Sequence, residues 1–248
     1  MLWLAKRETL RVSKLWTQTV LAPVVSSMLF IVVFGLSLGD RIRETGGVHY
    51  EVFIVPGLIA MAMVQAAYAN NASTIFQARS DRYVNDILSA PMHPWQMTLG
   101  FTVGGVVRAL GIGAALTVVS VLLVGAPVEK PFALLAAVVL GLVAFAALGL
   151  VVGIYAESWD HTTFIANIVI LPLAFVGGTF YSVDVLPAFW ETATHFNPVF
   201  YLVQAVRFGF LGESDVSIWL SLGVTAALAV PAYLWAQWLF TTGRRLKD

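Results

Sequence analysis

Long apolar segments separated by short polar ones dominate the pattern of this chain. Six windows approach the roughly 20 mainly apolar residues that a membrane-spanning helix needs: about 19–39, 52–74, 98–125, 132–155, 163–181 and 219–241. None carries Asp or Glu in its middle, and only the third contains a full charge, Arg108. No strand-like alternation competes with this pattern, so an outer-membrane barrel is not expected. The pattern predicts an all-α membrane protein with six transmembrane helices.

The composition supports a chain surrounded by lipid. Of its 248 residues, 59% are apolar and 11% are charged, whereas soluble domains carry roughly 25% charged residues. The formal net charge is zero, which gives no indication of nucleic-acid binding, and the lack of cysteine excludes disulfides and thiolate metal sites. Short connections between the windows predict a single transmembrane domain over residues 1–248. No cleavage site closes the first apolar stretch, so we expect no signal peptide.

Lysine and arginine residues in the short loops predict the orientation, because cytoplasmic loops carry more of them. If the termini share a side with the loops after the second and fourth spans, that side holds nine and the other side four. The nine are Lys6, Arg7, Arg11, Lys14, Arg79, Arg82, Arg244, Arg245 and Lys247; the four are Arg41, Arg43, Lys130 and Arg207. Both termini are therefore predicted to be cytoplasmic.

Residues 1–17 have the pattern of an amphipathic helix lying along the membrane interface. Arg7, Arg11 and Lys14 recur at helical spacing and form one basic stripe, which would face the lipid headgroups. The opposite side holds Ala5, Thr9, Val12 and Trp16. The alternative is an ordinary basic flank with no fixed geometry.

The polar loop between residues 77 and 96 contains a second short amphipathic segment. Ser80 and Asp81 resemble an N-cap and Pro91 ends any helix near residue 90, so a helix is predicted over 80–90. Its faces differ: one holds Tyr83, Ile87 and Ala90, and the other holds Arg82, Asn85 and Asp86. Either a partner protein or the chain's own spans would cover the apolar face.

An aromatic segment precedes the last span and is too polar to cross the bilayer. Its aromatic residues are Phe189, Trp190, Phe196, Phe200, Tyr201, Phe208 and Phe210, and Pro187 and Pro198 divide it into two pieces. Aromatic residues with polar edges are typical of the membrane interface. Residues 184–208 are therefore predicted to form two short re-entrant helices in the outer leaflet, which would also accommodate Asp184, Glu191, His195 and Arg207.

The motifs of ATP binding, metal binding and hydrolysis are missing from the sequence. A phosphate-binding loop needs Gly-Lys followed by Ser or Thr, and none of Lys6, Lys14, Lys130 and Lys247 follows a glycine. The histidines His49, His93, His161 and His195 are scattered without metal-ligand spacing. No Ser–His–Asp arrangement or nucleophile elbow is recognisable. No catalytic or metal-binding residues are predicted, and ATP-driven work would have to come from a partner.

Polar residues inside the spans are the candidates for a translocation path. The second span contains Gln65, Tyr68 and Asn70, the fifth contains Asn167, and Phe180 lies near the end of the fifth. Such a seam suits the passage of an amphipathic molecule, and it suits hydrogen bonding between helices equally well. Arg108 lies among Gly104, Gly105, Gly111 and Gly113. It would either line the path or tether neighbouring helices. We take Gln65, Tyr68, Asn70, Arg108, Asn167 and Phe180 as the predicted path.

Two other function classes fit the pattern less well. Proton-coupled transporters place Asp, Glu or His inside the membrane, and these spans contain none in their middles. The two halves of the chain also lack the similarity that many secondary transporters show. A secondary transporter or channel without an ATPase therefore remains the alternative. A membrane-embedded enzyme would need a catalytic cluster.

Five stretches of the chain, in order, resemble the permease subunits of type-2 ABC exporters, which include daunorubicin-type drug-resistance, nodulation lipo-oligosaccharide and polysaccharide export permeases. They are Phe53-Ile-Val-Pro-Gly-Leu58, Asp86-Ile-Leu-Ser-Ala-Pro91, Gly177-Gly-Thr-Phe-Tyr181, Asn197-Pro198 with Tyr201, and Arg207-Phe-Gly-Phe-Leu-Gly212. Each is weakly specific alone, and the five together cover essentially the whole chain. Asp86 stands where many relatives have Glu, which preserves the charge.

The resemblance implies a non-catalytic permease subunit in the bacterial cytoplasmic membrane. It implies a homodimer with two copies of a separate ABC ATPase, which would bind ATP and Mg, and no cofactor on this chain. Residues 1–17 would be an elbow helix in contact with lipid, and 80–90 the coupling helix that docks on the ATPase. Its contact residues would be Arg82, Tyr83, Asp86, Ile87, Leu88 and Pro91. The exported substrate would be a drug, a lipid or a lipid-linked glycan.

Overall fold

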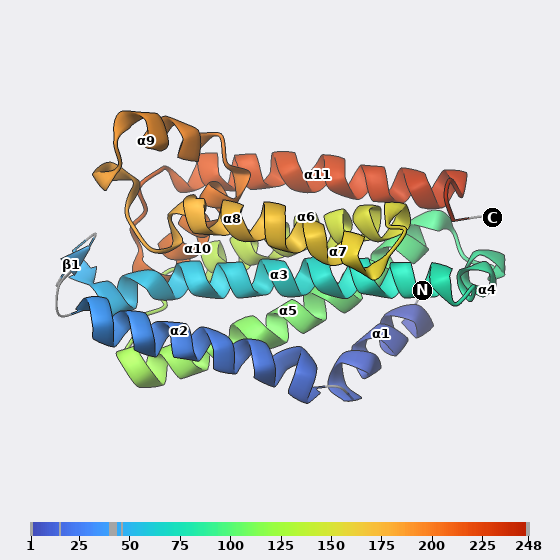
Figure 1. The fold of residues 1–248 in the computed structure, drawn as a ribbon, viewed down its shortest axis with the longest axis horizontal. Helices are drawn as coiled ribbons and strands as arrows, with labels where there is room; N and C mark the ends of the chain where they lie inside the picture. Colours follow the sequence, from blue (N-terminus) through green and yellow to red (C-terminus); the bar gives the residue numbers. More distant parts are fainter. Residues whose placement is uncertain (1, 15, 40–43, 46, 247–248) are drawn as a thin grey trace.

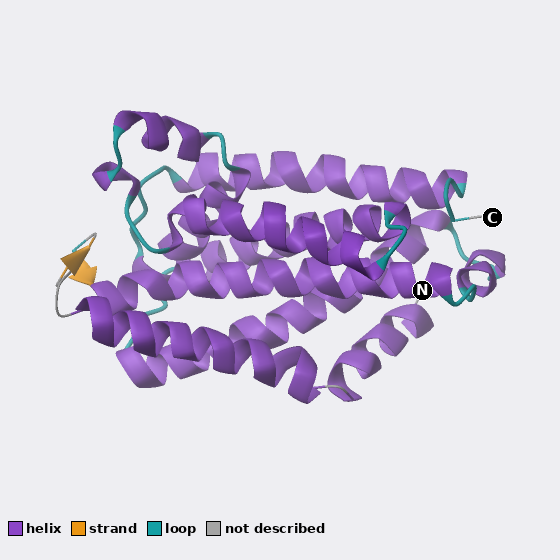
Figure 2. Cartoon of the chain, in the orientation of Figure 1, coloured by secondary structure: helices purple, strands orange, loops and turns teal. Residues whose placement is uncertain are grey.

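The computed structural model describes residues 2–14, 16–39, 44–45 and 47–246, which form an elongated bundle of helices (Figure 1). Helix dominates the described chain, apart from loops and one small β-hairpin (Figure 2). In the first half lie α1 (Leu2–Lys14), η1 (Thr17–Leu21), α2 (Ala22–Gly39), β1 (Glu44–Thr45), β2 (Val48–His49), α3 (Tyr50–Ser80), α4 (Val84–Ser89) and α5 (Pro94–Val124). In the second half lie α6 (Pro131–Tyr155), α7 (Trp159–Ile165), η2 (Ala166–Ile170), α8 (Leu171–Ala174), η3 (Phe175–Thr179), η4 (Val183–Val185), α9 (Ala188–His195), α10 (Pro198–Leu211) and α11 (Ile218–Thr242).

Six helices in the described residues are long and apolar enough to cross a membrane, which confirms the predicted number of spans. They are Thr17–Phe34, Tyr50–Ser80, Pro94–Val124, Pro131–Tyr155, Trp159–Thr179 and Ile218–Thr242. The second span continues six residues beyond the predicted end at 74, because a helix backbone extends past the apolar window into polar residues. Three residues used for the orientation, Arg41, Arg43 and Lys247, lie outside the described residues, as does the side chain of Val12.

Helix α3 occupies the centre of the bundle. In its most apolar stretch 78% of the residues are buried within the chain, against 6% for the first span. Its backbone touches that of α6, because a Cβ added to Gly149 would lie 2.4 Å from the Tyr68 carbonyl oxygen, and one added to Gly153 would lie 2.4 Å from that of Ala72. Small residues at such positions let membrane helices approach closely. The first span, by contrast, leaves most of its surface for lipid or another subunit.

Both termini and α4 lie at the same end of the bundle, and the β-hairpin and α9 lie at the other (Figure 1). At the first end, Arg79 in the last turn of α3 donates hydrogen bonds to the carbonyl oxygens of Ile154 (2.5 Å) and Ala156 (3.0 Å). These carbonyls end α6, where a cation is favourable because the helix dipole is negative there. Arg79 thus fastens α3 to the end of α6.

Helix α1 forms as predicted, but its basic residues do not all face outward. Glu8 is 1% exposed, and its carboxylate pairs with Arg7 (2.7 Å) and Arg11 (3.3 Å). Arg11 also donates to Asn70 Oδ1 in α3 (3.1 Å). A Cβ on Gly104 would lie 2.7 Å from Glu8 Cβ, so α1 sits closely against α5. The predicted headgroup-facing stripe is therefore wrong for Arg11, because a buried carboxylate needs a cationic partner.

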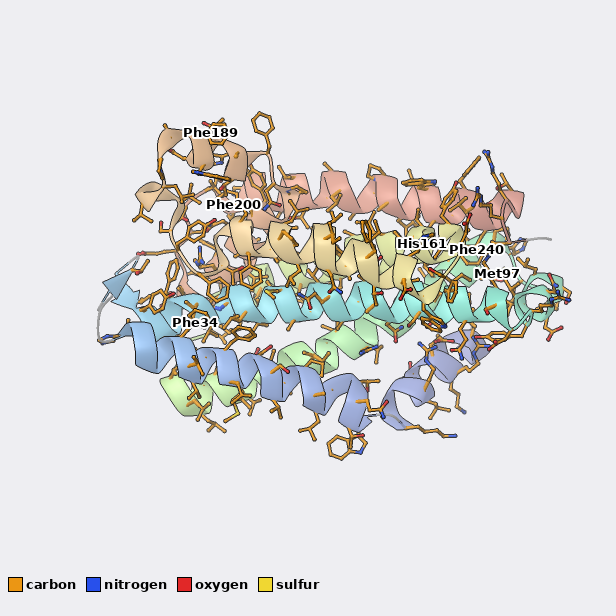
Figure 3. All side chains as sticks on the ribbon, in the orientation of Figure 1. Phe34, Met97, His161, Phe189, Phe200 and Phe240 are labelled. Carbon is orange, nitrogen blue, oxygen red and sulfur yellow. The ribbon has the colours of Figure 1, made fainter. Side chains whose placement is uncertain are left out.

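The aromatic segment folds into two short helices, as predicted, but their environments differ. Phe189 of α9 is 75% exposed and points away from the bundle, whereas Phe200 of α10 is buried (Figure 3). Asn197 separates the two helices and caps α10 by accepting a hydrogen bond from the Val199 N–H (2.9 Å). Phe200 is therefore covered by the chain's own helices and does not face lipid, because α10 packs against α6, α11 and α3. The depth of these helices in a membrane stays a prediction.

Candidate functional site

The helix predicted over residues 80–90 is shorter and begins later. Ser80 is the last residue of α3. The Asp81 N–H donates a hydrogen bond to the Gln77 carbonyl oxygen (2.9 Å) and so closes that helix. Arg82 then turns the chain with a φ of 60°. The predicted N-cap at Ser80 and Asp81 is wrong because Ser80 ends α3 and Asp81 is the C-cap of that helix, whereas α4 runs only from Val84 to Ser89.

The two faces of α4 meet different surroundings. Val84 and Ile87 are buried in a core formed with α1, α5, α6 and α11. Exposed residues of this segment include Arg82, Asn85, Asp86, Ser89 and Pro91, while Tyr83 and Leu88 are half-buried. The chain's own helices therefore cover the apolar face, and what remains for a partner is mainly polar.

A cavity of about 610 Å³ lies between α1 and α4. Its lining residues are Leu4, Arg7, Tyr83, Asp86, Ile87, Ala90 and Met92. The Arg7 guanidinium carbon lies 5.6 Å from the centroid of the Tyr83 ring. Burial raises the pKa of the Tyr83 phenol and Arg7 opposes that shift, so the phenol is a neutral hydrogen-bonding group near pH 7. With charged residues among apolar walls, this cavity is suited to receive a side chain from another protein.

A second pocket, of about 400 Å³, lies between α2, α3 and α5, and we call it the α2–α3 pocket. Its lining residues are Gln18, Ala22, Pro23, Ser26, Ser27, Phe30, Leu58, Met61, Ala62, Gln65, Ala66, Ala69 and Arg108. Arg108 Nε donates to the Thr19 carbonyl oxygen (3.3 Å). Arg108 thus tethers η1 to α5, which is one of the two roles that the sequence left open, and it also lines this pocket. Its place on a translocation path stays a prediction.

The other predicted path residues are dispersed. Tyr68 is 1% exposed and donates from its hydroxyl to the Thr162 carbonyl oxygen (3.0 Å), so it joins α3 to α7. Asn70 is buried and donates to Asn71 Oδ1 (3.1 Å). Asn167 is exposed on η2. Phe180 packs on Phe34, with ring centroids 5.1 Å apart. Of the six, Gln65 and Arg108 line the α2–α3 pocket together.

Sequence reasoning missed a buried polar cluster at the end that carries α9. Arg207 is 2% exposed and donates from Nη2 to the Gly178 carbonyl oxygen (2.6 Å). Its guanidinium carbon lies 4.0 Å from the centroid of the Phe53 ring, and Nη1 lies 3.8 Å from Asp215 Oδ2. Asp215 also accepts from Gln204 Nε2 (2.7 Å). The sequence carried a signal for this cluster, because Phe53, Gly178 and Arg207 belong to three of the five stretches that resemble the exporter permeases.

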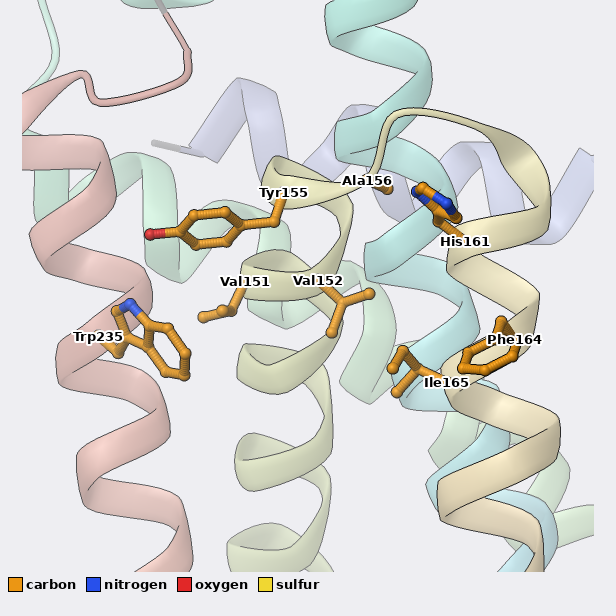
Figure 4. Close-up of a pocket in the computed structure, with 8 residues that line it drawn as sticks. All are labelled: Val151, Val152, Tyr155, Ala156, His161, Phe164, Ile165 and Trp235. Carbon is orange, nitrogen blue, oxygen red and sulfur yellow. The ribbon is translucent and has the colours of Figure 1, made fainter.

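A third cavity, of about 610 Å³, lies between α6, α7 and α11 (Figure 4). Its lining residues are Val151, Val152, Tyr155, Ala156, His161, Phe164, Ile165 and Trp235. His161 Nδ1 accepts a hydrogen bond from the Glu157 N–H (3.4 Å). Since the walls are almost entirely apolar, this cavity suits hydrocarbon chains and offers little to orient a polar ligand.

Comparisons with known proteins place this geometry in context. Residues 1–211 match the family described as ABC-2 type transporter. The chain is similar to the inner membrane transport permease YadH of Escherichia coli (strain K12), with 36% identity over 242 residues that cover 98% of this chain and 94% of that protein. It is also similar to nodulation protein J of Rhizobium leguminosarum bv. trifolii, with 26% identity over 236 residues that cover 94% and 90% of the two chains.

Proposed function

The chain belongs to the ABC-2 type transporter family and is a multi-pass membrane permease of an ABC transporter, and on that premise we propose that it is the membrane subunit of an exporter. A separate ABC ATPase, carrying ATP and Mg, would dock on α4 and drive an amphipathic substrate (a drug, a lipid or a lipid-linked glycan) out across the bacterial inner membrane. The permease itself would be non-catalytic.

The exposed face of α4 is the observation that supports the docking site. It presents Asn85 and Asp86, beside Arg82 of the preceding turn, at the end of the bundle that also carries both termini. The apolar residues beneath it, Val84 and Ile87, anchor α4 to the spans. A force applied to this face would therefore reach α5, α6 and α11 through direct packing. We place this end, with both termini, in the cytoplasm, as the distribution of Lys and Arg indicates.

The weak burial of the first span supports assembly with a second copy. Its most apolar stretch is 6% buried within the chain, and it exposes Leu29, Phe30 and Val33. Lipid covers such a surface as readily as protein does, so the dimer rests mainly on the family. We propose that two copies of the chain form the translocation path between them.

Reversing the charge of Asp86 tests the docking site. We expect Asp86→Lys to reduce the ATPase retained by the tagged permease by about ten-fold or more, the size of losing a hydrogen bond to a charged group. The measurement is co-purification with the ATPase encoded in the neighbouring reading frame, followed by quantification of both chains. Ile87→Asp is unsuitable, because Ile87 is 8% exposed and an aspartate there would disturb the fold.

Glu157→Lys is the matched control for this experiment. Glu157 is an exposed carboxylate in the α6–α7 loop, whose side chain is 75% exposed. Its reversal should leave the retained ATPase unchanged. Equal retention by Asp86→Lys and wild type would remove α4 as the docking element. Substrate movement by the isolated chain on a proton gradient, with no ATPase present, would contradict the proposed function itself.

A further inference from the structure

Arg108, the cation in the α2–α3 pocket, has no anionic partner among the residues that the structure describes. The ion pairs between described residues are Arg7–Glu8, Arg11–Glu8, Arg207–Asp215 and Arg245–Glu157, and Arg108 takes part in none of them. Its one hydrogen bond to a described residue uses Nε, which leaves both Nη atoms free. A charged residue within a membrane span is costly and normally finds a counter-charge or serves a function.

A second donor in the same pocket also lacks a partner. Gln65 lines the pocket from α3, and its Nε2 is buried without a hydrogen-bond partner among the described residues. Leaving such a donor unsatisfied costs about 1–3 kcal/mol. Ser26 and Ser27 line the same pocket from α2. The polar part of the pocket therefore offers hydrogen-bond donors and one positive charge, and contains no carboxylate.

The rest of the pocket is apolar and reaches the surface of the bundle. Phe30, Leu58 and Met61 belong to its apolar wall. Among its lining residues Gln18, Ala22, Ser26, Phe30 and Ala69 are exposed, so the pocket opens between α2 and α3. Because this opening lies beside the weakly buried first span, a molecule dissolved in the membrane can enter sideways.

We propose that the α2–α3 pocket binds the anionic headgroup of an amphipathic molecule, with Arg108 and Gln65 as the headgroup ligands. A guanidinium fits a phosphate or carboxylate through paired donors. The hydrocarbon chain would lie along the apolar wall toward the opening. The further step, that this molecule is the exported cargo, rests on the proposed function; the headgroup binding does not.

Photo-crosslinking with two matched probes tests the pocket. The full-length chain is placed in phosphatidylcholine nanodiscs with a diazirine-bearing acylglycerol 3-phosphate, or with the same acylglycerol lacking the phosphate. Labelled peptides are then quantified by mass spectrometry. We expect the anionic probe to label residues 22–30 and 58–69 about ten-fold more than the neutral probe, since hydrogen bonds to charged groups have this strength. A free-acid probe with the same acyl chain tests whether the pocket also binds a carboxylate headgroup.

Substitutions test whether Arg108 causes the stronger labelling by the anionic probe. Arg108→Gln should abolish the ten-fold preference, and Arg108→Lys should keep part of it. Arg244→Gln, which removes an exposed charge outside the pocket, should leave it unchanged. If Arg108→Gln fails to fold, Ser26→Glu decides: it adds a negative charge at an exposed lining position and should repel the anionic probe without affecting the neutral one. Equal labelling by both probes, or a preference that survives Arg108→Gln and Ser26→Glu, would overturn the proposal.

ATP turnover distinguishes the two molecules that could carry such a headgroup, which are a transported substrate and a resident membrane lipid. In proteoliposomes with the ATPase, a transported molecule should lose labelling in the pocket when ATP is added, whereas a resident membrane lipid should stay. Retained, Arg108-dependent labelling would support the headgroup site and overturn its role for cargo. Because the crosslinking itself needs no ATPase, failure to assemble with an ATPase leaves its result intact, and the two proposals fail independently.

Discussion

Gly149→Ala is expected to destabilise the protein by about 3 kcal/mol, the upper end of the cost of overpacking a core. The added Cβ would lie 2.4 Å from the Tyr68 carbonyl oxygen. That oxygen belongs to the α3 backbone, so it cannot move aside as the end of a flexible side chain would. The two central helices would have to separate, and their shared contacts would weaken along the whole interface. The measurement is the free energy of unfolding in mixed micelles under increasing sodium dodecyl sulfate.

Gly223→Ala in α11 is the matched control, since nothing lies within 4 Å of a Cβ added there. Alanine is a better helix former than glycine by about 1 kcal/mol, so this variant should be neutral or slightly more stable. The two identical substitutions are therefore expected to have opposite signs. A Gly149→Ala variant as stable as wild type would mean that α3 and α6 do not meet through their backbones.

The six spans were predictable because each is a local property of the sequence. An apolar window is readable without knowing its neighbours: the helices α3, α6 and α11 contain the windows predicted for them, and α5 ends at Val124, one residue before the predicted end at 125. The ends were less predictable, as at Ser80, because a helix boundary depends on turns such as the one at Arg82. Amphipathic spacing also predicted that α1 and α4 exist, since it too involves only nearby residues.

The candidate sites were harder to predict because they depend on contacts between distant residues. Arg207 was counted as a loop charge, yet it is buried against Gly178 and Phe53, which lie 29 and 154 positions away in the chain. The sequence predicted that Arg11 faces the lipid headgroups, but Arg11 donates a hydrogen bond to Asn70. Conversely, Tyr68 and Asn70 are polar residues inside a span that join helices. A polar residue in a span is visible from the sequence, but its partner is not.

The buried pair Arg207–Asp215 carries the second large effect that we expect. Asp215→Ala should destabilise the protein by about 3–5 kcal/mol, because it leaves the Arg207 guanidinium buried without its counter-charge. It also removes the acceptor of Gln204 Nε2 and of the Ser182 hydroxyl (3.1 Å). Since Arg207 lies over Phe53 at the start of α3, the first turns of the central helix should loosen first.

The double variant Arg207→Met/Asp215→Ala separates the charge from the packing. Methionine fills much of the volume of arginine and needs no counter-charge, so the double variant should be more stable than Asp215→Ala alone. The control is Glu157→Ala, which breaks an exposed pair at nearly the same distance: Arg245 Nη1 lies 3.9 Å from Glu157 Oε1, against 3.8 Å for Arg207–Asp215. An exposed pair contributes about 0–1 kcal/mol. The two ion pairs therefore differ in burial and have nearly the same distance between nitrogen and oxygen. Strictly additive losses from Arg207→Met and Asp215→Ala would show that the two side chains act independently and that their ion pair does not stabilise the protein.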